Sequence, residues 1–207
     1  MNDISIIPEQ KKGSKVTYSR CIAKNSVSDA EELFAITKTK LLDINNWHEL
    51  GVSSYFCLYD EKGTRKDFPA TGDYIRIGLP APGTVAGDGF DWVIIERKDE
   101  LKDDDHESFG LRLRPSRNPV SDRVEISHFF TDDATSTFII ERKGKSVTAN
   151  YYGRNEVANV KGVSKLFDKM RNIVVAISGK LGISKIHWKK FINNIIDENY
   201  RAEEPEE

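Results

Sequence analysis

Hydrophobic and polar positions follow two different periods along the chain, and each period predicts its own kind of element. Residues 16–24 alternate between apolar and polar side chains, which predicts a strand. Ser28 and Glu31 then have the spacing of a capping box, and apolar residues at helical spacing from Ala30 to Leu41 predict a helix. A short second helical segment is expected at 44–50, where Trp47 would anchor it before Gly51 ends it.

Between residues 53 and 152 the period becomes two and turn-forming residues recur. The alternation predicts strands at 54–59, 73–79, 89–97, 108–114, 123–131, 135–142 and 146–152. Most of the connections are short, and short connections join antiparallel neighbours. We therefore expect one antiparallel sheet in this part of the chain.

The helical period returns at Gly162. An apolar stripe runs from Val163 to Ile177, and a second stripe begins at Trp188. The predicted fold class is α+β, with a curved antiparallel sheet of about seven to eight strands wrapped on a long C-terminal helix and a short helix pair after the first strand. We expect a single domain over residues 15–196, a mobile N-terminal tail over 1–14 and an acidic C-terminal tail over 197–207.

This order of elements resembles the START/Bet v1-like helix-grip (SRPBCC) superfamily. The features that carry the resemblance are the strand at 16–24, the helices that end with Trp47, the Gly72-Asp73 entry to a strand and the long helix from Gly162. Seven strands are expected here after the helix pair, whereas the superfamily usually has six. The resemblance implies a cavity between the curved sheet and the last helix, which binds apolar ligands in most members and catalyses reactions in a minority.

Composition and charge narrow the classes of partner. The 207 residues carry a net charge of -2, so bulk electrostatics favours neither nucleic acid nor an anionic membrane, and no nucleic-acid partner is expected. Cys21 and Cys57 lack metal-ligand spacing, and no export signal is evident, which together predict a reducing, cytoplasmic location. No apolar run approaches the roughly 20 residues that span a bilayer. We expect no metal and no cofactor.

The predicted inner face of the sheet supplies the candidate ligand-binding residues. Trp92 and Glu96 share one face of the 89–97 strand, and His128 and Phe130 share one face of the 123–131 strand. Apolar walls with a few polar groups are typical of ligand pockets. Glu96 and His128 would orient a ligand or, if the protein is an enzyme, act as acid and base. The alternative is that both groups lie at strand ends, solvated or satisfied by hydrogen bonds, and no catalytic residue is assigned.

Other charged or glycine-rich patterns each have a structural explanation as well as a functional one. Arg112 and Arg114, with Arg117 nearby, suit a carboxylate or phosphate, or simply the wet face of a strand. The run 103–106 (Asp-Asp-Asp-His) suits a hard cation or, as we favour, a charged hairpin tip. The glycines at 83, 87 and 89 precede a strand, which favours a loop at the cavity mouth over a phosphate loop.

Two functional hypotheses follow. The first is the binding of a small apolar or amphipathic ligand in a cavity between the sheet and the C-terminal helix. The second is a protein–protein interaction module with a filled core, which would use the basic helix face formed by Lys161, Lys165 and Lys169. Hydrolase, metalloprotease and nucleotide-binding motifs are absent from the sequence, so an enzyme is the less favoured class.

Overall fold

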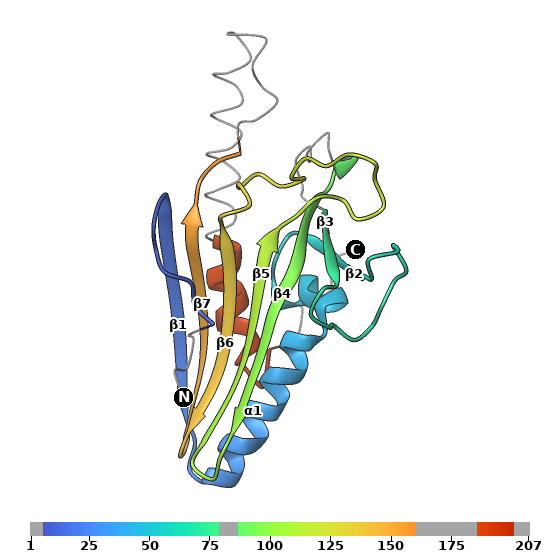
Figure 1. The fold of residues 1–207 in the computed structure, drawn as a ribbon. Helices are drawn as coiled ribbons and strands as arrows, with labels where there is room; N and C mark the ends of the chain where they lie inside the picture. The colour runs from blue at the N-terminus through green and yellow to red at the C-terminus, as the bar shows by residue number, and fades with distance from the viewer. Residues whose placement is uncertain (1–5, 79–86, 160–185, 201–207) are drawn as a thin grey trace, which may run out of the picture.

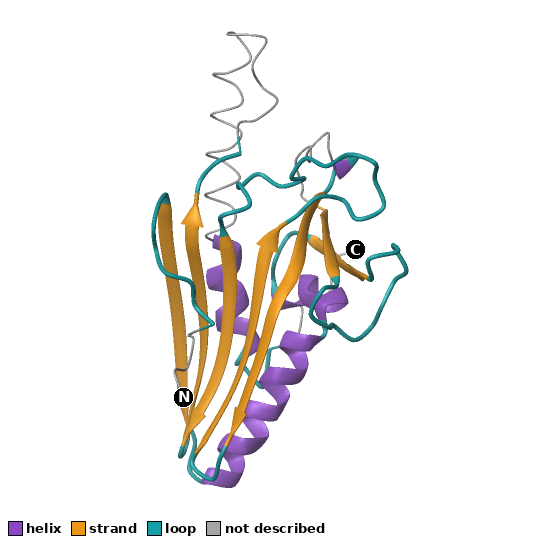
Figure 2. Ribbon diagram, in the orientation of Figure 1, coloured by secondary structure: helices purple, strands orange, loops and turns teal. Residues whose placement is uncertain are grey.

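A single open antiparallel sheet with helices on one face forms the molecule, in the α+β class that the sequence predicts (Figures 1 and 2). The computed structural model describes residues 6–78, 87–159 and 186–200. Within them the strand order is β1-β7-β6-β5-β4-β3-β2. The elements are β1 (Ser14–Ala23), α1 (Val27–Leu42), the 3-10 helix η1 (Ile44–Leu50), β2 (Tyr55–Tyr59), β3 (Tyr74–Gly78), β4 (Asp91–Lys102), β5 (His106–Pro115), β6 (Thr135–Lys143), β7 (Ser146–Glu156) and a helix over 186–195.

The ends of the first two helices show why they begin and stop where they do. Ser26 caps α1, because its extended backbone lets the side chain accept a hydrogen bond from the Asp29 amide at 3.0 Å. The cap therefore lies two residues before the predicted Ser28, which is already inside the first turn. Gly51 ends η1 as predicted, with the left-handed φ of 78° that glycine adopts without strain.

Aromatic side chains fill the space between the sheet and the helices. Trp47 is fully buried, and the rings of Phe56, Phe138, Trp188 and Phe191 have centroids 5.1–6.2 Å from its own. Its indole N–H donates to the Leu41 carbonyl at 3.1 Å. Beside this cluster α1, the sheet and the 186–195 helix leave no gap large enough for a water molecule. The residues around this place are Leu41, Phe138, Ile139, Ile140, Ala149, Asn150, Phe191, Ile192 and Ile195. This part of the interior is a packed core.

The strand predicted at 123–131 does not exist, so six strands follow the helix pair in the described residues. The segment belongs to the connection between β5 and β6, and Val124 is 77% exposed. Its backbone pairs with the chain beyond β7, through an isolated bridge between Phe130 and Ala158 and a bond from the Asn159 amide to the Phe129 carbonyl. The alternating apolar and polar residues of 123–131 therefore belong to a loop with one covered side and one exposed side, and they do not form a strand of the sheet.

Strand β4 continues to Lys102, although the strand predicted from the sequence ends at residue 97. A bulge explains the difference, because the register with β5 shifts between Ile95 and Arg97 and Glu96 is the extra residue. Beyond the bulge the faces exchange, so that Lys98 lies opposite the core residue Leu111. The polar residues of this half of β4 thus face the helices, which hides the strand from a search for alternation.

The chain before β1 packs across the outer face of the sheet. Ile6 is buried against Gly110, where a Cβ would come within 2.6 Å of the Ile6 side chain. Arg112 donates to the Ile6 carbonyl at 2.9 Å, and Asn155 donates to the Glu9 carbonyl at 3.0 Å. Residues 6–13 fall in the range for which the sequence predicts a mobile tail, and here they are held by the outer face.

Several sequence predictions fall outside the described residues. These are the helix at 163–177, the basic face of Lys161, Lys165 and Lys169, the glycine at position 83 and the end of the acidic tail. None of the helices that the structure describes combines the length and apolar composition needed to cross a bilayer.

Candidate functional site

Trp92 and Glu96 lie on the outer face of the sheet. Val93 and Ile95 belong to the core beneath the helices, and successive strand residues point to opposite faces. Trp92 is nevertheless only 5% exposed. Its amide donates to the Ser127 carbonyl at 2.7 Å and its carbonyl accepts from the Ser116 amide at 2.9 Å, so the β5–β6 connection lies beside it. This end of β4 therefore has buried apolar residues on both faces, Val93 on one and Trp92 on the other, and the sequence prediction took the outer face for the inner one.

Glu96 forms an ion-pair group with two arginines of β5. Its carboxylate lies 2.6 Å from Nε of Arg112, and Nε and Nη2 of Arg114 donate to its two oxygens at 2.7 and 3.1 Å. The bidentate geometry satisfies the planar guanidinium of Arg114 from within the molecule. Arg112 and Arg114, which suggested an anion site from the sequence, therefore already pair with Glu96.

His128 and Phe130 lie together in the β5–β6 connection. Nδ1 of His128 accepts from the Phe130 amide at 2.9 Å, and Asn159 donates to the His128 carbonyl at 3.1 Å. No hydrogen bond or ion pair joins Glu96 to His128. The structure therefore brings Trp92 close to the connection that carries His128 and Phe130, but it does not make an acid–base pair of Glu96 and His128.

The acidic run at 103–106 forms the tight turn between β4 and β5. The His106 amide donates to Oδ1 of Asp103 at 2.8 Å, and Nε2 of His106 lies 2.9 Å from Glu141. Among the described residues no group of three or more histidine, cysteine or acidic side chains could hold a metal ion. The charged hairpin tip that the sequence favoured is what the structure shows.

A second group of polar side chains lies on the helix-facing side of the sheet, and the sequence prediction missed it. We call this group the inner-face polar cluster; it comprises Ser14 and Tyr18 of β1, Ser136 of β6, and Tyr151 and Glu156 of β7. The hydroxyl oxygens of Ser136 and Tyr151 are 3.1 Å apart, and Ser14 donates to Oε2 of Glu156 at 2.8 Å. The rings of Tyr18 and Tyr151 stack with centroids 6.1 Å apart.

The end of β7 has the local shape that brings an acid onto this face. Asn155 has a left-handed φ of 55°, which turns the chain so that Glu156 folds back over the strand. A Cβ at Gly153 would lie 2.3 Å from Oε1 of Glu156 and 3.2 Å from the Tyr151 hydroxyl. Because residue 153 is a glycine, there is space for the Glu156 carboxylate near the Tyr151 hydroxyl. Glu156 is only 8% exposed in this position.

Burial and the nearby carboxylate change the acidity of both tyrosines. Burial is the larger cause and the charge of Glu156 the next, and together they raise the pKa of the fully buried Tyr151 well above 10.0. The same two causes, in the same order, raise the pKa of Tyr18. The charge of Glu156 thus opposes ionisation of both hydroxyls. Trp188 covers Tyr151 at a centroid distance of 5.4 Å.

The raised pKa of Tyr151 makes stability depend on alkaline pH. The unfolded chain ionises its tyrosines near pH 10 while folded Tyr151 stays neutral, so the stabilisation is complete below pH 10 and is lost as the pH rises. We expect Tyr151→Phe to remove about 1.4 kcal/mol per pH unit from the slope of unfolding free energy above pH 10. Urea denaturation at several alkaline pH values checks this. The exposed Tyr55→Phe variant should keep the wild-type slope, and an unchanged slope in Tyr151→Phe would contradict the assignment.

A signal for this cluster exists in the sequence but is weak. Val147, Ala149 and Tyr151 alternate as an inner face should, so Tyr151 could have been placed on it. The predicted strand stops at Tyr152, however, and the left-handed turn at Asn155 has no sequence signature strong enough to direct Glu156 inward.

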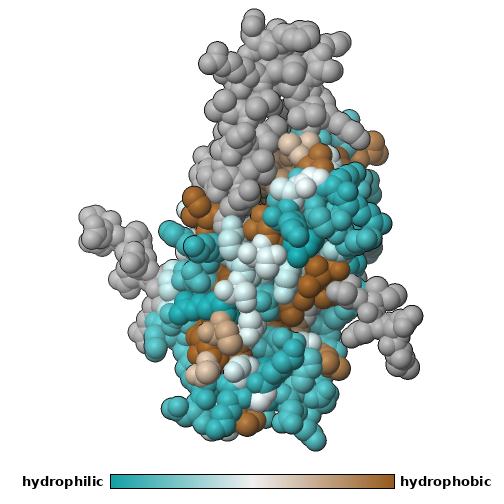
Figure 3. Space-filling model, turned by 90° about the vertical axis from the view of Figure 1, so that its left-hand side faces the viewer, coloured by the Kyte–Doolittle hydropathy of each residue, from teal (hydrophilic) through white to brown (hydrophobic). Residues whose placement is uncertain are grey.

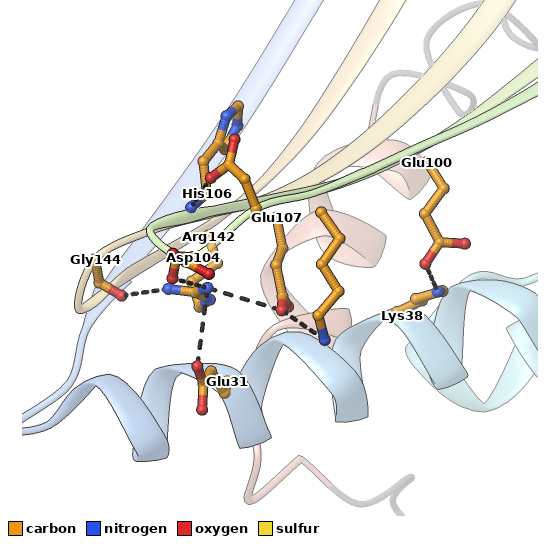
Figure 4. Close-up of polar contacts among 10 residues, drawn as sticks. Glu31, Lys38, Glu100, Asp104, His106, Glu107, Arg142 and Gly144 are labelled. Carbon is orange, nitrogen blue, oxygen red and sulfur yellow. Dashed lines mark hydrogen bonds and ion pairs between the residues drawn. The ribbon is translucent and has the colours of Figure 1, made fainter.

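A buried arginine closes the opposite end of the space between sheet and α1 (Figure 4). Arg142 donates to the backbone carbonyls of Gly144 and Asp104 at 3.2 and 3.3 Å. Its Nη2 lies 3.7 Å from Glu107 and 3.9 Å from Glu31 of α1. This group ties two hairpin turns to the first turns of the helix, a structural role.

Comparison with known proteins finds solved structures that resemble the chain, two of them distantly. No family model matches the chain, and no curated protein matches it. One similar solved structure is a putative uncharacterised protein from Bacillus thuringiensis, 12% identical with a TM-score of 0.37, covering 89% of this chain and 100% of that one. A solution NMR structure from Staphylococcus epidermidis is also 12% identical, with a TM-score of 0.33, and covers 94% and 98% of the two chains. At these TM-scores the likeness assigns no family and no function.

Proposed function

We propose that this protein binds a small amphipathic molecule at the inner-face polar cluster. The observation that carries the proposal is a carboxylate, Glu156, buried beside the Tyr151 hydroxyl at the end of the inner face where Tyr18 and Trp188 pack against the core. Pockets for small ligands combine apolar walls with a few placed polar groups. The partly exposed ring of Tyr18 and the ring of Trp188 would contact ligand carbon, while Glu156 would accept a hydrogen bond from a ligand hydroxyl or amine.

The packed core supports this place over the middle of the sheet. The gap beside α1 and the 186–195 helix has no room for a water molecule, which favours the end where β7 leaves the sheet as the place for a ligand. The β1–β7–β6 order is compatible with the helix-grip resemblance, as are the six strands that follow the helix pair in the described residues. Membership of the helix-grip superfamily is itself part of the proposal.

Native mass spectrometry and thermal shift measurements on the full chain test the proposal. We expect a co-purified or added amphipathic alcohol or amine to raise the Tm of the wild type. Glu156→Gln and Gly153→Ala should each weaken binding about tenfold or more, since a lost charge-assisted hydrogen bond is worth roughly 1.5–3 kcal/mol. Glu125→Gln, at an exposed position, is the matched control. Binding that survives both site variants would refute the assignment.

A protein-interaction module is the second candidate, and the filled core favours it. Large exposed side chains, among them Phe68 and Val124, lie on the loops around the sheet. Seen from the β1 side, however, the apolar groups of the described surface are separated by polar ones and form no continuous apolar face (Figure 3). Salt-sensitive capture of one defined protein partner, with no bound compound in native mass spectra, would favour this candidate over ligand binding.

A further inference from the structure

A half-buried arginine on the outer face of the sheet has aromatic neighbours but no acidic partner among the described residues. Ile75 and Ile77 face the core, so Arg76 between them points outward. Its guanidinium carbon lies 4.4 Å from the ring centroid of Phe90 and 5.3 Å from that of Tyr59. Within the described residues its hydrogen-bond partner is the Cys57 sulfur, at 3.9 Å, and no oxygen accepts from it.

Other arginines on the outer face donate to oxygen atoms, which Arg76 does not do within the described residues. Arg112 and Arg114 share the Glu96 carboxylate. Arg154 also lies over a ring, 5.2 Å from the centroid of Tyr152, yet it donates to the Val16 and Gly153 carbonyls at 2.8 Å. Aromatic faces stabilise a guanidinium charge by roughly 0.5–1 kcal/mol, but they leave the N–H donors of Arg76 unused.

A second unused donor stands beside Arg76. Trp92 is directly opposite it in the β3–β4 register, and side chains at such positions are close neighbours. The buried indole N–H of Trp92 has no acceptor among the described residues. The Tyr59 ring lies 5.7 Å from the Trp92 ring, so aromatic groups surround both donors.

We propose that these residues form a second binding site, for a small aromatic carboxylate. We call it the Arg76 patch: Cys57, Tyr59, Arg76, Phe90 and Trp92. A planar carboxylate matches the fork of a guanidinium and accepts two N–H donors at once. An aromatic ring attached to it would pack on the side chains that already flank Arg76. The site lies on the other face of the sheet from the inner-face polar cluster and does not depend on it.

Benzoate is the test ligand, followed through the three tryptophan indole N–H signals in NMR spectra, with the Trp92 signal assigned by Trp92→Phe. We expect saturable benzoate binding that shifts the Trp92 signal and exceeds the binding of acetate. Arg76→Gln should weaken it by about tenfold or more, and Arg76→Lys, which keeps the charge but not the fork, by less. Arg65→Gln and Glu156→Gln should leave it unchanged. Absence of saturable binding, equal affinity for acetate, or full binding by Arg76→Gln would overturn the proposal.

Discussion

Trp47→Ala is expected to lower the free energy of unfolding by about 3–5 kcal/mol, the loss typical of removing a large buried aromatic side chain. Trp47 lies where η1, the sheet and the 186–195 helix meet, and four aromatic rings pack around it. The substitution would leave a cavity that these stiff rings cannot close, and it would also leave the Leu41 carbonyl without its donor. Urea denaturation followed by circular dichroism measures the loss.

Phe68→Ala is the matched control for this experiment. Phe68 is also aromatic but is 83% exposed, so its truncation should change the free energy of unfolding by no more than about 0.5 kcal/mol. A loss below about 1 kcal/mol for Trp47→Ala would mean that the core relaxes around the cavity, and it would contradict the packed interior described above.

Arg142→Met should destabilise the protein by about 2–4 kcal/mol, because each buried carbonyl that loses its donor costs about 1–3 kcal/mol. Glu107 would keep a cation, since Nζ of Lys102 lies 3.0 Å from its Oε1, closer than the 3.7 Å to Nη2 of Arg142. The carbonyls of Asp104 and Gly144 would lose their donor at the same time. Truncation therefore costs more than the modest strength of a contact at 3.7 Å suggests.

A double-mutant cycle separates charge from packing at this position. Glu107→Gln in the Arg142→Met background should change the free energy of unfolding by no more than about 1 kcal/mol, since only the pair with the exposed Lys102 is then lost. The neighbouring Lys143→Met variant removes an exposed cation that contacts Glu141, and it should cost at most about 1 kcal/mol. If Glu107→Gln restores most of the stability that Arg142→Met loses, an uncompensated Glu107 charge, and not the two carbonyls, is the cause of the loss.

The sequence predicted those parts of the fold in which local pattern and tertiary environment agree. The apolar residues from Ala30 to Leu41 follow one helical stripe because a single face of α1 is buried. Strands such as β6 alternate because one of their faces meets the helices. The segment 123–131 misled the prediction because a loop that is covered on one side shows the same alternation, and β4 was cut short because its bulge at Glu96 inverts the pattern.

The candidate sites were harder to predict, because they depend on which segments meet in space. Trp92 was expected on the inner face because the sequence of its own strand does not indicate that the β5–β6 connection lies beside it. The inner-face polar cluster needs β1 to lie beside β7, together with the left-handed turn at Asn155. The N–H groups of Arg76 have no oxygen acceptor among the described residues. This can be recognised only once the positions of the neighbouring oxygens in the fold are known.

The pairing of the first strand with the last has a consequence for how the chain is made. β1 has β7 as its neighbour in the sheet, and their register joins Ser14 to Glu156. A ribosome releases the chain from its N-terminus, so β1 is synthesised long before a partner exists, and the loop that its pairing closes is entropically costly. The strands β2 to β7 each pair with a neighbour in sequence and close no such loop, so we expect β1 to be the last strand to join the sheet on the ribosome.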